Sequence, residues 1–420
     1  MIIIYNIALL ILYFFSFILK PFFPKFKERE KNVNSSLQSL NKLDHTRKKT
    51  WFHAASVGEF EQAKPIIETL KSKFPDLQII CSFFSPSAYR TQAKYEYADA
   101  TFYLPLDLPT NSKFVINKIK PNAVVFVRYE LWANYLFLLK KYNVPTFLVN
   151  ATAPNQNFFN KMLFMKKFYK FVFSLFHTIF VVNSDHSHYF KQLDVKPDVQ
   201  ILPDTRFDRI VQKVETAKSK PIISHSSFSD KFIFVAGSIW EKDFEIIANA
   251  LIKYNSNNSN KITSILVPHE PHETFLQTIE TVFPNSIRLS KLLSEPQTIQ
   301  SGGVVLVDSI GKLLMLYSNA YFAYVGGAFG VGVHSLTEPA GYGIPIACGP
   351  NCFNSPDAKP MLDCNALSII RNSDEFHRLI TELTNNQTLH KIRSEASRNY
   401  VYSKVGSSDK FVEFLSQFLQ

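Results

Sequence analysis

Short apolar segments alternate with segments of helical spacing along most of this chain, and this alternation limits its fold more than any other feature. Apolar runs typical of strands occur in the first half at 51–56, 77–84, 123–127, 146–150 and 178–182. Segments of helical spacing occur between them, at 60–73, 131–141 and 158–175. This alternation is typical of βαβ units, in which helices cover parallel strands. The chain is therefore predicted to be an α/β protein.

The pattern is interrupted once, at 218–230, and then begins again. The interruption, KSKPIISHSSFSD, has no clear periodicity and contains a proline and five serines, which is typical of a linker. Strand-like runs follow at 232–236, 263–267, 304–307, 321–325 and 344–348. We therefore predict two doubly wound, Rossmann-like domains, 51–217 and 231–400, that face each other across a cleft, with a C-terminal helix at 401–420.

The amino terminus is apolar from residue 2 to residue 19, apart from Asn6. A helix of this length extends roughly 27 Å, close to the hydrocarbon thickness of about 30 Å. Basic residues follow it, from Lys20 to Lys31, whereas a signal peptide needs them in front. By the positive-inside rule, the rest of the chain is expected on the cytoplasmic side. We predict a membrane anchor at 1–19, spanning or interfacial, and a basic linker at 20–50; the alternative is a buried helix.

The formal charge of +11 is unevenly distributed between the two halves. Residues 1–220 contain 31 Lys and Arg against 17 Asp and Glu, whereas residues 221–420 contain 15 against 18. The first half is therefore expected to meet an anionic partner. We expect a membrane surface and no nucleic acid. Four cysteines without a CxxC pair, in a chain of 420 residues, exclude a disulfide framework and disfavour a zinc site.

A glycine-rich loop, GGAFGVG at 326–332, directly follows an apolar strand. Glycines allow a ligand to approach the backbone, and helix-start N–H groups attract phosphate. Glu338 follows at the start of a helical segment, where a carboxylate can accept two hydrogen bonds from a ribose diol. The loop fits neither the Walker sequence nor GxGxxG. The alternatives are a tight turn for the loop and an ordinary helix-start acid for Glu338.

Two carboxylates follow predicted strands of the first domain. Glu59 ends the string HAASVGE after the strand 51–56, and Glu130 follows the strand 123–127. Carboxyl ends of parallel strands share one edge of a sheet, so these acids are expected to be neighbours, able to raise each other's pKa or to act as a general base. The alternatives are a helix-start acid for Glu59 and a Lys or Arg partner for Glu130.

Histidines offer weaker signals. His269 follows the strand 263–267 in the string HEPHE, which does not have the HExxH spacing of a zinc site. Its position favours ligand binding, and simple loop polarity is the alternative. His186 and His188 are one residue apart and would not share a helix face, so we expect them on a solvated surface.

Ordered motifs along nearly the whole chain resemble the bacterial 3-deoxy-D-manno-octulosonic acid (Kdo) transferases, which transfer Kdo from CMP-Kdo to a lipid A precursor. The string HAASVGE, at 53–59, resembles that family's HxxSVGE segment. Further matches are SPS at 85–87, YLPLD at 103–107, ELWAN at 130–134, DTRFD at 204–208, GSIW at 237–240, VPHE at 267–270, DSIG at 308–311 and GVHSLTE at 332–338. Four positions depart from the pattern: Ala88 and Pro203 replace glycine, Ala133 replaces proline and Ser335 replaces asparagine.

The resemblance implies a GT-B fold, with an acceptor domain at the membrane and a CMP-Kdo domain after it. It implies an inverting transfer to lipid IVA at the cytoplasmic face of the inner membrane, without a cofactor or a metal. Glu59 is similar to the family's general base, and Glu130 to its functional neighbour. The implied donor-binding residues are Ser238, His269, Gly326, Gly327, Gly330, Gly332, His334, Ser335 and Glu338. The implied acceptor-binding residues are Ser56, Ser85 and Arg206.

Two other functions remain open on the sequence. One is a GT-B transferase that uses another donor, such as a UDP-sugar. The other is a membrane-anchored lipid-binding protein that kept the fold without the activity, against which the presence of both Glu59 and Glu130 argues.

Overall fold

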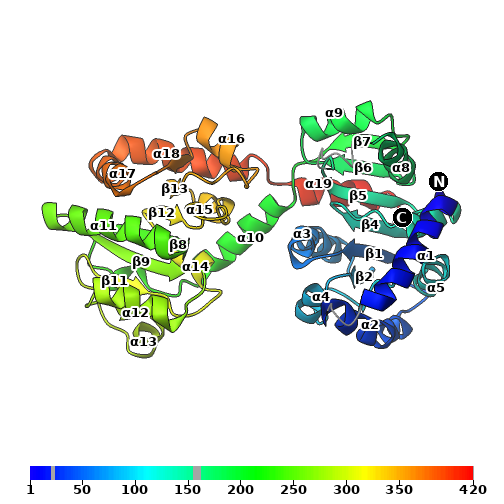
Figure 1. The fold of residues 1–420 in the computed structure, drawn as a ribbon, viewed down its shortest axis with the longest axis horizontal. Coiled ribbons are helices and arrows are strands. Elements are labelled where there is room, and N and C mark those ends of the chain that lie inside the picture. Colours follow the sequence, from blue (N-terminus) through cyan, green and yellow to red (C-terminus); the bar gives the residue numbers. More distant parts are fainter. Residues whose placement is uncertain (20–23, 155–161, 420) are drawn as a thin grey trace. The chain divides into compact units, whose positions relative to one another are not determined.

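The computed structural model describes residues 1–19, 24–154 and 162–419 (Figure 1). The chain forms two compact units, Met1–Arg209 with Val405–Gln420, and Ile210–Lys404. Each unit is built on one parallel sheet of seven strands, so the chain is an α/β protein. The sequence-based domains, 51–217 and 231–400, leave out the residues before 51 and the last helix, which the structure assigns to the first unit. The facing of the two units across a cleft stays a prediction.

The sheet of the first unit has the strand order β3-β2-β1-β4-β5-β6-β7. Its strands are β1 (Lys49–Ala54), β2 (Gln78–Phe83), β3 (Ala100–Tyr103), β4 (Ala123–Val127), β5 (Thr146–Ala151), β6 (Thr178–Val181) and β7 (Asp198–Ile201). Except for the edge strand β7, they are buried throughout. Burial on both faces explains why these strands appear in the sequence as continuous apolar runs instead of alternating ones.

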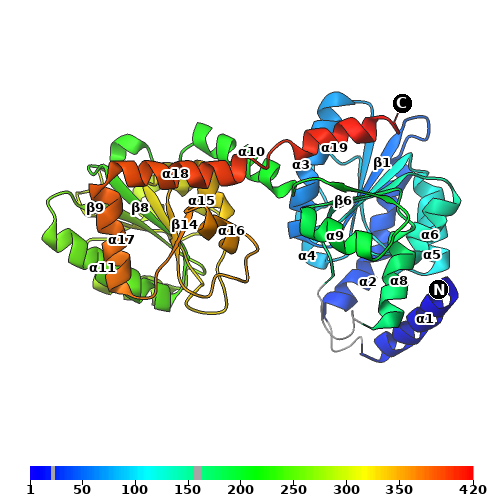
Figure 2. The same ribbon diagram turned by 90° about the horizontal axis from the view of Figure 1, so that it is seen from above.

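Helices cover both faces of this sheet, and each face has its own hydrophobic core. One face is covered by α5 (Pro109–Ile119), α6 (Ala133–Lys141), α8 (Leu163–Phe173) and α9 (Ser184–Gln192). The other is covered by α3 (Val57–Lys73), α4 (Pro86–Gln92) and α19 (Ser407–Ser416). Figure 2 shows α19, in red, beside α3. The predicted helix 158–175 begins at residues outside the described ranges, and α8 accounts for its later part.

The predicted linker at 20–50 contains two helices, α2 (Pro24–Ser36) and the 3-10 helix η2 (Leu37–Lys42). Leu40 of η2 is fully buried in the core. The Ser36 hydroxyl accepts a hydrogen bond from the Tyr103 amide at 3.0 Å, and the Ser39 hydroxyl donates to the Thr101 carbonyl at 2.7 Å. Both contacts lie along the edge strand β3. The segment is polar, but it covers an edge that would otherwise be open to pairing.

The end of the chain returns to the first unit through Asp208. Helix α18 (Gln387–Tyr402) ends well before the terminus, and Gly406 takes a left-handed φ of 96° before α19 begins. The buried Asp208 carboxylate accepts hydrogen bonds from the Gly406 amide at 2.6 Å and from the Ser408 amide and hydroxyl, both at 2.7 Å. The segment predicted as one helix, 401–420, is therefore broken at Gly406 because the chain turns there.

The sheet of the second unit has the order β10-β11-β9-β8-β12-β13-β14. Its strands are β8 (Phe232–Ile239), β9 (Ile262–Pro268), β10 (Ile287–Arg288), β11 (Val304–Leu306), β12 (Phe322–Val325), β13 (Ile346–Cys348) and β14 (Leu367–Ile369). Its other elements are α11 (Glu241–Asn257), α12 (Glu273–Val282), α13 (Leu289–Ser294), α14 (Leu313–Leu316), α15 (Thr337–Tyr342), α16 (Ala358–Asp363), α17 (Ser373–Asn385) and the 3-10 helices η3 (His225–Ser227) and η4 (Tyr317–Asn319). Helix α10 (Arg206–Ser219) contains the division between the units.

Helix α1 (Ile2–Leu19) lies against the first unit along one side. Ile2 and Tyr5 pack on the core, and the Tyr5 hydroxyl donates to the Asp107 carboxylate at 2.7 Å. Ile3, Ile7 and Leu10, on the other side of the helix, are exposed. Within the described ranges, no helix combines the length and the apolar character needed to cross a bilayer.

Candidate functional site

Each sheet has one point where its strand order reverses, and the sequence-predicted residues gather there. In the first unit the reversal lies between β1 and β4, and in the second between β8 and β12. At such a reversal, the loops that follow the two neighbouring strands run in opposite directions along the sheet. A crevice therefore forms at the carboxyl ends of the two strands, and open α/β sheets bind ligands there. Glu59 and Glu130 follow β1 and β4. Ser238 and the glycine loop belong to the ends of β8 and β12.

Glu59 sits in the first turn of α3 and closes a capping box with Ser56. The Ser56 amide donates to Glu59 Oε2 at 2.9 Å, and the Glu59 amide donates to Ser56 Oγ at 3.3 Å. The helix-start alternative is therefore part of what Glu59 does. Burial raises the pKa of the Glu59 carboxyl, and the negative charge of Glu130 raises it further. The two acids are close enough to interact, as the sequence predicted.

Glu130 is held by two ring N–H groups. His53 Nε2 lies 3.0 Å from Glu130 Oε2, and Trp132 Nε1 donates to the same oxygen at 2.6 Å. The Glu130 side chain is only 13% exposed, and that of His53 is fully buried. A carboxylate can only accept, so the His53 nitrogen that faces it carries a proton. The alternative interpretation of Glu130 was a Lys or Arg partner, and the partner that the structure shows is His53.

The other nitrogen of His53 is also bonded. Its Nδ1 lies 2.8 Å from Ser82 Oγ, and Trp51 Nε1 donates to that same hydroxyl at 2.8 Å. His53 Nδ1 also lies 3.2 Å from the Ser82 carbonyl oxygen, and the Ser82 hydroxyl donates to the Phe52 carbonyl at 3.5 Å. A buried chain of hydrogen bonds therefore runs from Trp51 through Ser82 and His53 to Glu130. Such a chain fixes the orientation of its last member.

The remaining predicted acceptor residues lie around the same loops. The Ser85 amide donates to the Ala55 carbonyl at 2.9 Å, so the turn after β2 is tied to the loop after β1. The Ser85 hydroxyl lies 2.7 Å from that of Ser87. Arg206 pairs with Asp204 at 3.4 Å and lies over the Phe207 ring. Acceptor binding by Ser56, Ser85 and Arg206 stays a prediction.

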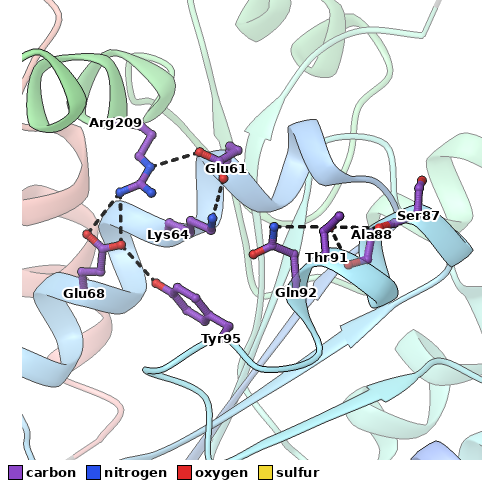
Figure 3. Close-up of polar contacts among 9 residues, drawn as sticks. All are labelled: Glu61, Lys64, Glu68, Ser87, Ala88, Thr91, Gln92, Tyr95 and Arg209. Carbon is purple, nitrogen blue, oxygen red and sulfur yellow. Dashed lines mark hydrogen bonds and ion pairs between the residues drawn. The ribbon is translucent and has the colours of Figure 1, made fainter. Parts of the chain in front are cut away.

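Helix α3, which carries Glu59, is braced by the first residues of α10 (Figure 3). Arg209 Nε donates to Glu61 at 3.1 Å, and its Nη1 donates to Glu68 at 3.2 Å. Lys64 donates to Glu61 at 2.5 Å, and the Tyr95 hydroxyl donates to Glu68 at 3.2 Å. These partly buried charges form a network on one side of α3, so the helix that positions Glu59 is fixed along two of its turns.

In the second unit, β8 bulges at Ser238, which takes a left-handed φ of 54°. The bulge brings its backbone against the glycine loop, so a Cβ on Gly326 would stand 2.3 Å from the Ser238 carbonyl oxygen. Only glycine allows this approach. The main chains of Ser238 and Gly326, two residues predicted to bind the donor, therefore lie in contact.

The four loop glycines direct their amides inward. Gly326 N donates to the Gly237 carbonyl at 2.9 Å, and Gly327 N donates to the buried Asp243 carboxylate at 2.9 Å. The amides of Gly330 and Gly332 both donate to the Gly327 carbonyl, at 2.9 and 3.2 Å. These N–H groups hold the loop in shape. Ligand binding by this loop stays a prediction.

Three aromatic rings stack beside this loop. His269 stacks on Trp240 at 4.7 Å between ring centroids and on His334 at 4.3 Å. Trp240 Nε1 donates to His334 Nε2 at 3.3 Å, which puts the proton of a neutral His334 on Nδ1. Burial lowers the pKa of His334, and the nearby His269 lowers it further. The stack offers ring N–H donors for an anionic ligand at the switch point.

Ser335 and Glu338 complete the predicted donor set. The Ser335 hydroxyl lies 3.5 Å from the Thr337 hydroxyl, at the limit of a hydrogen bond. Burial raises the pKa of Glu338, against the opposing charge of Lys213. Among the described residues, no group of three or more His, Cys, Asp or Glu side chains is arranged to hold a metal ion.

Comparison with known proteins identifies the family. The family model described as 3-deoxy-D-manno-octulosonic-acid transferase (kdotransferase) matches residues 25–209. The 3-deoxy-D-manno-octulosonic acid transferase of Aquifex aeolicus is 30% identical over 369 residues, which cover 87% of this chain and 90% of that protein. The chain belongs to the Kdo transferase family. The namesake enzyme of Chlamydia trachomatis serovar A is 25% identical over 374 residues, covering 87% and 84% of the two chains.

Solved structures agree on the fold of this Kdo transferase family member. The UDP-GlcNAc 2-epimerase of Neisseria meningitidis, bound to UDP-GlcNAc, superposes with a TM-score of 0.62 at 11% identity, over 88% of this chain and all of that one. MurG of Acinetobacter baumannii superposes with a TM-score of 0.52 at 12% identity, over 88% and 99%. At these identities the likeness concerns the fold alone. The chain is an enzyme of a glycosyltransferase family with a GT-B-like fold, and the family resemblance found in the sequence is confirmed.

Sequence reasoning missed three side chains that shape this site. His53 appeared only as part of a motif, Ser82 was one apolar-strand residue among several, and Asp243 lies 84 residues before Gly327. For His53 and Ser82 the available signal was a polar residue inside an apolar strand, since a polar group buried there needs a partner. The structure leaves His53, Ser82 and Asp243 each at most 1% exposed.

Proposed function

We propose that this enzyme transfers Kdo from CMP-Kdo to lipid IVA, with inversion at the anomeric carbon and with Glu59 as the general base. One observation carries the role of Glu59: it is a half-buried acid, at a switch point, whose pKa is raised by a second acid. A base is most effective when its pKa approaches the working pH. The Ser56 amide donates to Glu59 Oε2 at 2.9 Å, and a carboxylate has further acceptor positions that can receive the hydrogen of a substrate hydroxyl.

The reaction follows from these roles. Glu59 accepts the proton of an acceptor hydroxyl, and the freed oxygen electron pair forms the bond to the Kdo anomeric carbon. The bond from that carbon to the CMP phosphate oxygen breaks, and its electron pair leaves with CMP. Hydrogen-bond donors that are already in place stabilise the developing negative charge on the leaving phosphate. His269 and His334, beside the glycine loop, suit this task, and Glu338 suits the ribose of CMP.

The first unit suits an anionic lipid at the cytoplasmic leaflet of the inner membrane. Each basic residue near an anionic surface adds about 1 kcal/mol of attraction, and residues 1–220 have an excess of Lys and Arg over Asp and Glu. The exposed apolar side of α1 suits the hydrocarbon boundary. Flotation of the full chain with phosphatidylglycerol vesicles tests this location, and a chain that stays unbound at low salt refutes it.

The reaction itself is tested with purified protein, CMP-Kdo and tetra-acylated lipid A precursor, with the product mass as the readout. We expect a mass gain of one or more Kdo units. A parallel reaction with UDP-sugars addresses the alternative donor. Turnover of a UDP-sugar without turnover of CMP-Kdo would show the proposed donor to be wrong.

Glu130→Gln is expected to lower the pKa of Glu59 because it removes the negative charge that helps to raise it. A base must be deprotonated to act, so the acidic limb of the kcat/KM profile should move to lower pH, and rate at acidic pH should be retained better than in the parent. The amide oxygen of Gln can still accept from His53 and Trp132. The pH–rate profile and a carboxyl-carbon NMR titration of Glu59 measure the shift.

Glu68→Gln is the matched control, since Glu68 lies on the same helix but is not a cause of the Glu59 shift. Its acidic limb should coincide with that of the parent. An unchanged limb in Glu130→Gln, or an equal shift in both variants, would contradict the electrostatic coupling of Glu59 and Glu130.

A further inference from the structure

An apolar pocket of about 310 Å³ opens in the first unit beside the candidate acids. Its walls come from α1, α2 and the loops that follow β2, β3 and β4. Most of the lining is aliphatic or aromatic, including Leu9, Phe26, Phe84, Leu131 and Trp132. Nothing in the reaction described above uses this pocket.

The pocket and Glu130 share a wall. Trp132 lines the pocket, and its indole N–H donates to Glu130 Oε2 at 2.6 Å. The same ring packs against His53 and against Phe84, each at 5.3 Å between centroids. Only the Trp132 side chain therefore lies between Glu130 and a ligand that contacts this wall of the pocket.

The pocket offers few free polar groups to a ligand. Its one carboxylate, Asp107, is buried, and it accepts hydrogen bonds from the Tyr5 hydroxyl at 2.7 Å, the Asn134 amide at 3.0 Å and the Tyr135 amide at 3.2 Å. Burial raises the pKa of Asp107 to about 7, which reflects an environment poor in water. Since the polar groups are satisfied by the protein, an apolar chain is the ligand that gains most from this site.

A second, larger basin of about 910 Å³ adjoins the pocket and is basic. The two share Tyr13, Leu106 and Leu108 in their linings. Lys27, Arg29, Lys31 and Lys118 line the basin, with Glu30 as its acid. Cations beside an apolar pocket suit an amphiphile with an anionic head group.

Arg29 connects the two cavities. It is 2% exposed, donates to the Leu104 carbonyl and lies with its guanidinium 4.3 Å from the centre of the Phe84 ring. The structure gives its buried Nε no hydrogen-bond partner among the described residues. A buried guanidinium with an unused donor favours an anionic ligand close by.

We propose that the apolar pocket binds an acyl chain of the acceptor glycolipid while the basic basin holds its anionic head group. This rests on the proposed function. The exposed Ile3 and Leu10 of α1 suit the hydrocarbon boundary from which such a chain would enter. Trp132 then couples lipid binding to the reaction, because the side chain that contacts the acyl chain also holds Glu130.

Leu9→Trp tests the pocket, since the larger side chain occupies the space meant for the lipid. Ile7→Trp is the matched control on the exposed side of the same helix, where Ile7 is 55% exposed. With micellar lipid IVA, Leu9→Trp should raise the acceptor KM about tenfold or more, since each methylene kept out weakens binding roughly fourfold. The KM for CMP-Kdo should stay as in the parent. Ile7→Trp should keep both KM values.

Acceptors with shortened acyl chains give the second readout. The parent should lose affinity as the chains shorten, whereas Leu9→Trp should discriminate little between long and short chains. A variant that treats short-chain acceptors as well as the parent does is folded, so misfolding is excluded as the cause. Equal acceptor KM values in Leu9→Trp and Ile7→Trp would overturn the proposal. A Leu9→Trp variant that binds phosphatidylglycerol vesicles poorly but keeps its KM for micellar acceptor would also overturn the proposal. The pocket would then bind membrane lipid instead of the acceptor.

A direct binding measurement separates this proposal from the proposed function. A brominated fatty acid should quench Trp132 fluorescence in the full chain, and the quenched signal should be missing in Trp132→Phe. If the parent transfers no Kdo but shows this quenching, the proposed function fails and the acyl pocket stands. If the parent transfers Kdo and the quenching is absent, the acyl pocket fails alone.

Discussion

Glu59→Gln is expected to lower kcat by about 10²–10⁴-fold, the usual contribution of a positioned general base. The amide oxygen of Gln can accept from the Ser56 amide, as Glu59 Oε2 does at 2.9 Å, so the capping box and α3 should persist. The lost function is thus proton removal alone. Initial rates at saturating CMP-Kdo and lipid IVA measure the effect, with thermal unfolding as the check that stability is kept.

The control for Glu59→Gln is Glu61→Gln, two residues further along the same helix. Glu61 pairs with Lys64 and Arg209 and has no place in the proposed proton transfer. Its loss should cost some stability, because the pairs are partly buried, but it should leave kcat within about twofold of the parent, because the Arg209–Glu68 pair still holds α3. The KM for CMP-Kdo should be unchanged in both variants. A Glu59→Gln enzyme that transfers Kdo at the parental rate would refute the assignment of the base.

The structure gives Glu59 two tasks that compete for the same carboxylate. A helix cap favours the charged form, through hydrogen bonds and the helix dipole, and so lowers the pKa. Burial and the charge of Glu130 oppose this, and they prevail, because the pKa of Glu59 is raised. Glu130 therefore does more than line the site. Its charge opposes the effect of the cap on the pKa of Glu59, in the direction that the proposed general base requires.

The sequence predicted the interior of each sheet well and the edges poorly. The run 123–127 coincides with β4, whose five residues are all buried, because a strand covered on both faces must be continuously apolar. The strand β7, with the sequence DVQI, is exposed or half-buried throughout and has no such signature. The two-residue strand β10 is too short to have any pattern. Edge strands depend on pairing with a neighbour, which local sequence does not encode.

The candidate site could also be predicted only in part from the sequence. The proximity of Glu59 and Glu130 could be predicted because it requires only that two parallel strands end at one edge. The contact of His53 with Glu130 requires the register of β1, in which His53 is paired with Ser82 on one side and Phe126 on the other. Register is set by packing across the sheet, so a motif string alone could not reveal it. The contact of Asp243 with Gly327 also depends on packing, because Asp243 lies on helix α11 and Gly327 in the loop after β12.

Asp243 joins two parts of the second site through three hydrogen bonds to its carboxylate. Its carboxylate accepts from the Trp240 amide at 3.0 Å, the Gly327 amide at 2.9 Å and the Tyr324 hydroxyl at 2.6 Å, and the residue is 1% exposed. Trp240 belongs to the ring stack and Gly327 to the glycine loop. One buried side chain thus joins both parts of the proposed donor site.

Asp243→Ala is therefore expected to destabilise the enzyme by about 3 kcal/mol or more, since each buried donor left unpaired costs about 1–3 kcal/mol. The KM for CMP-Kdo should rise at least about tenfold, while the acceptor KM, which depends on the first unit, should change little. Tyr324→Phe removes one of the three donors together with its need for a partner, so it should be much milder. Urea unfolding and two-substrate kinetics below the unfolding range measure both effects. If Asp243→Ala lost stability but kept its KM for CMP-Kdo, the proposed donor site at the glycine loop would be contradicted, because this variant removes the acceptor of the Gly327 amide.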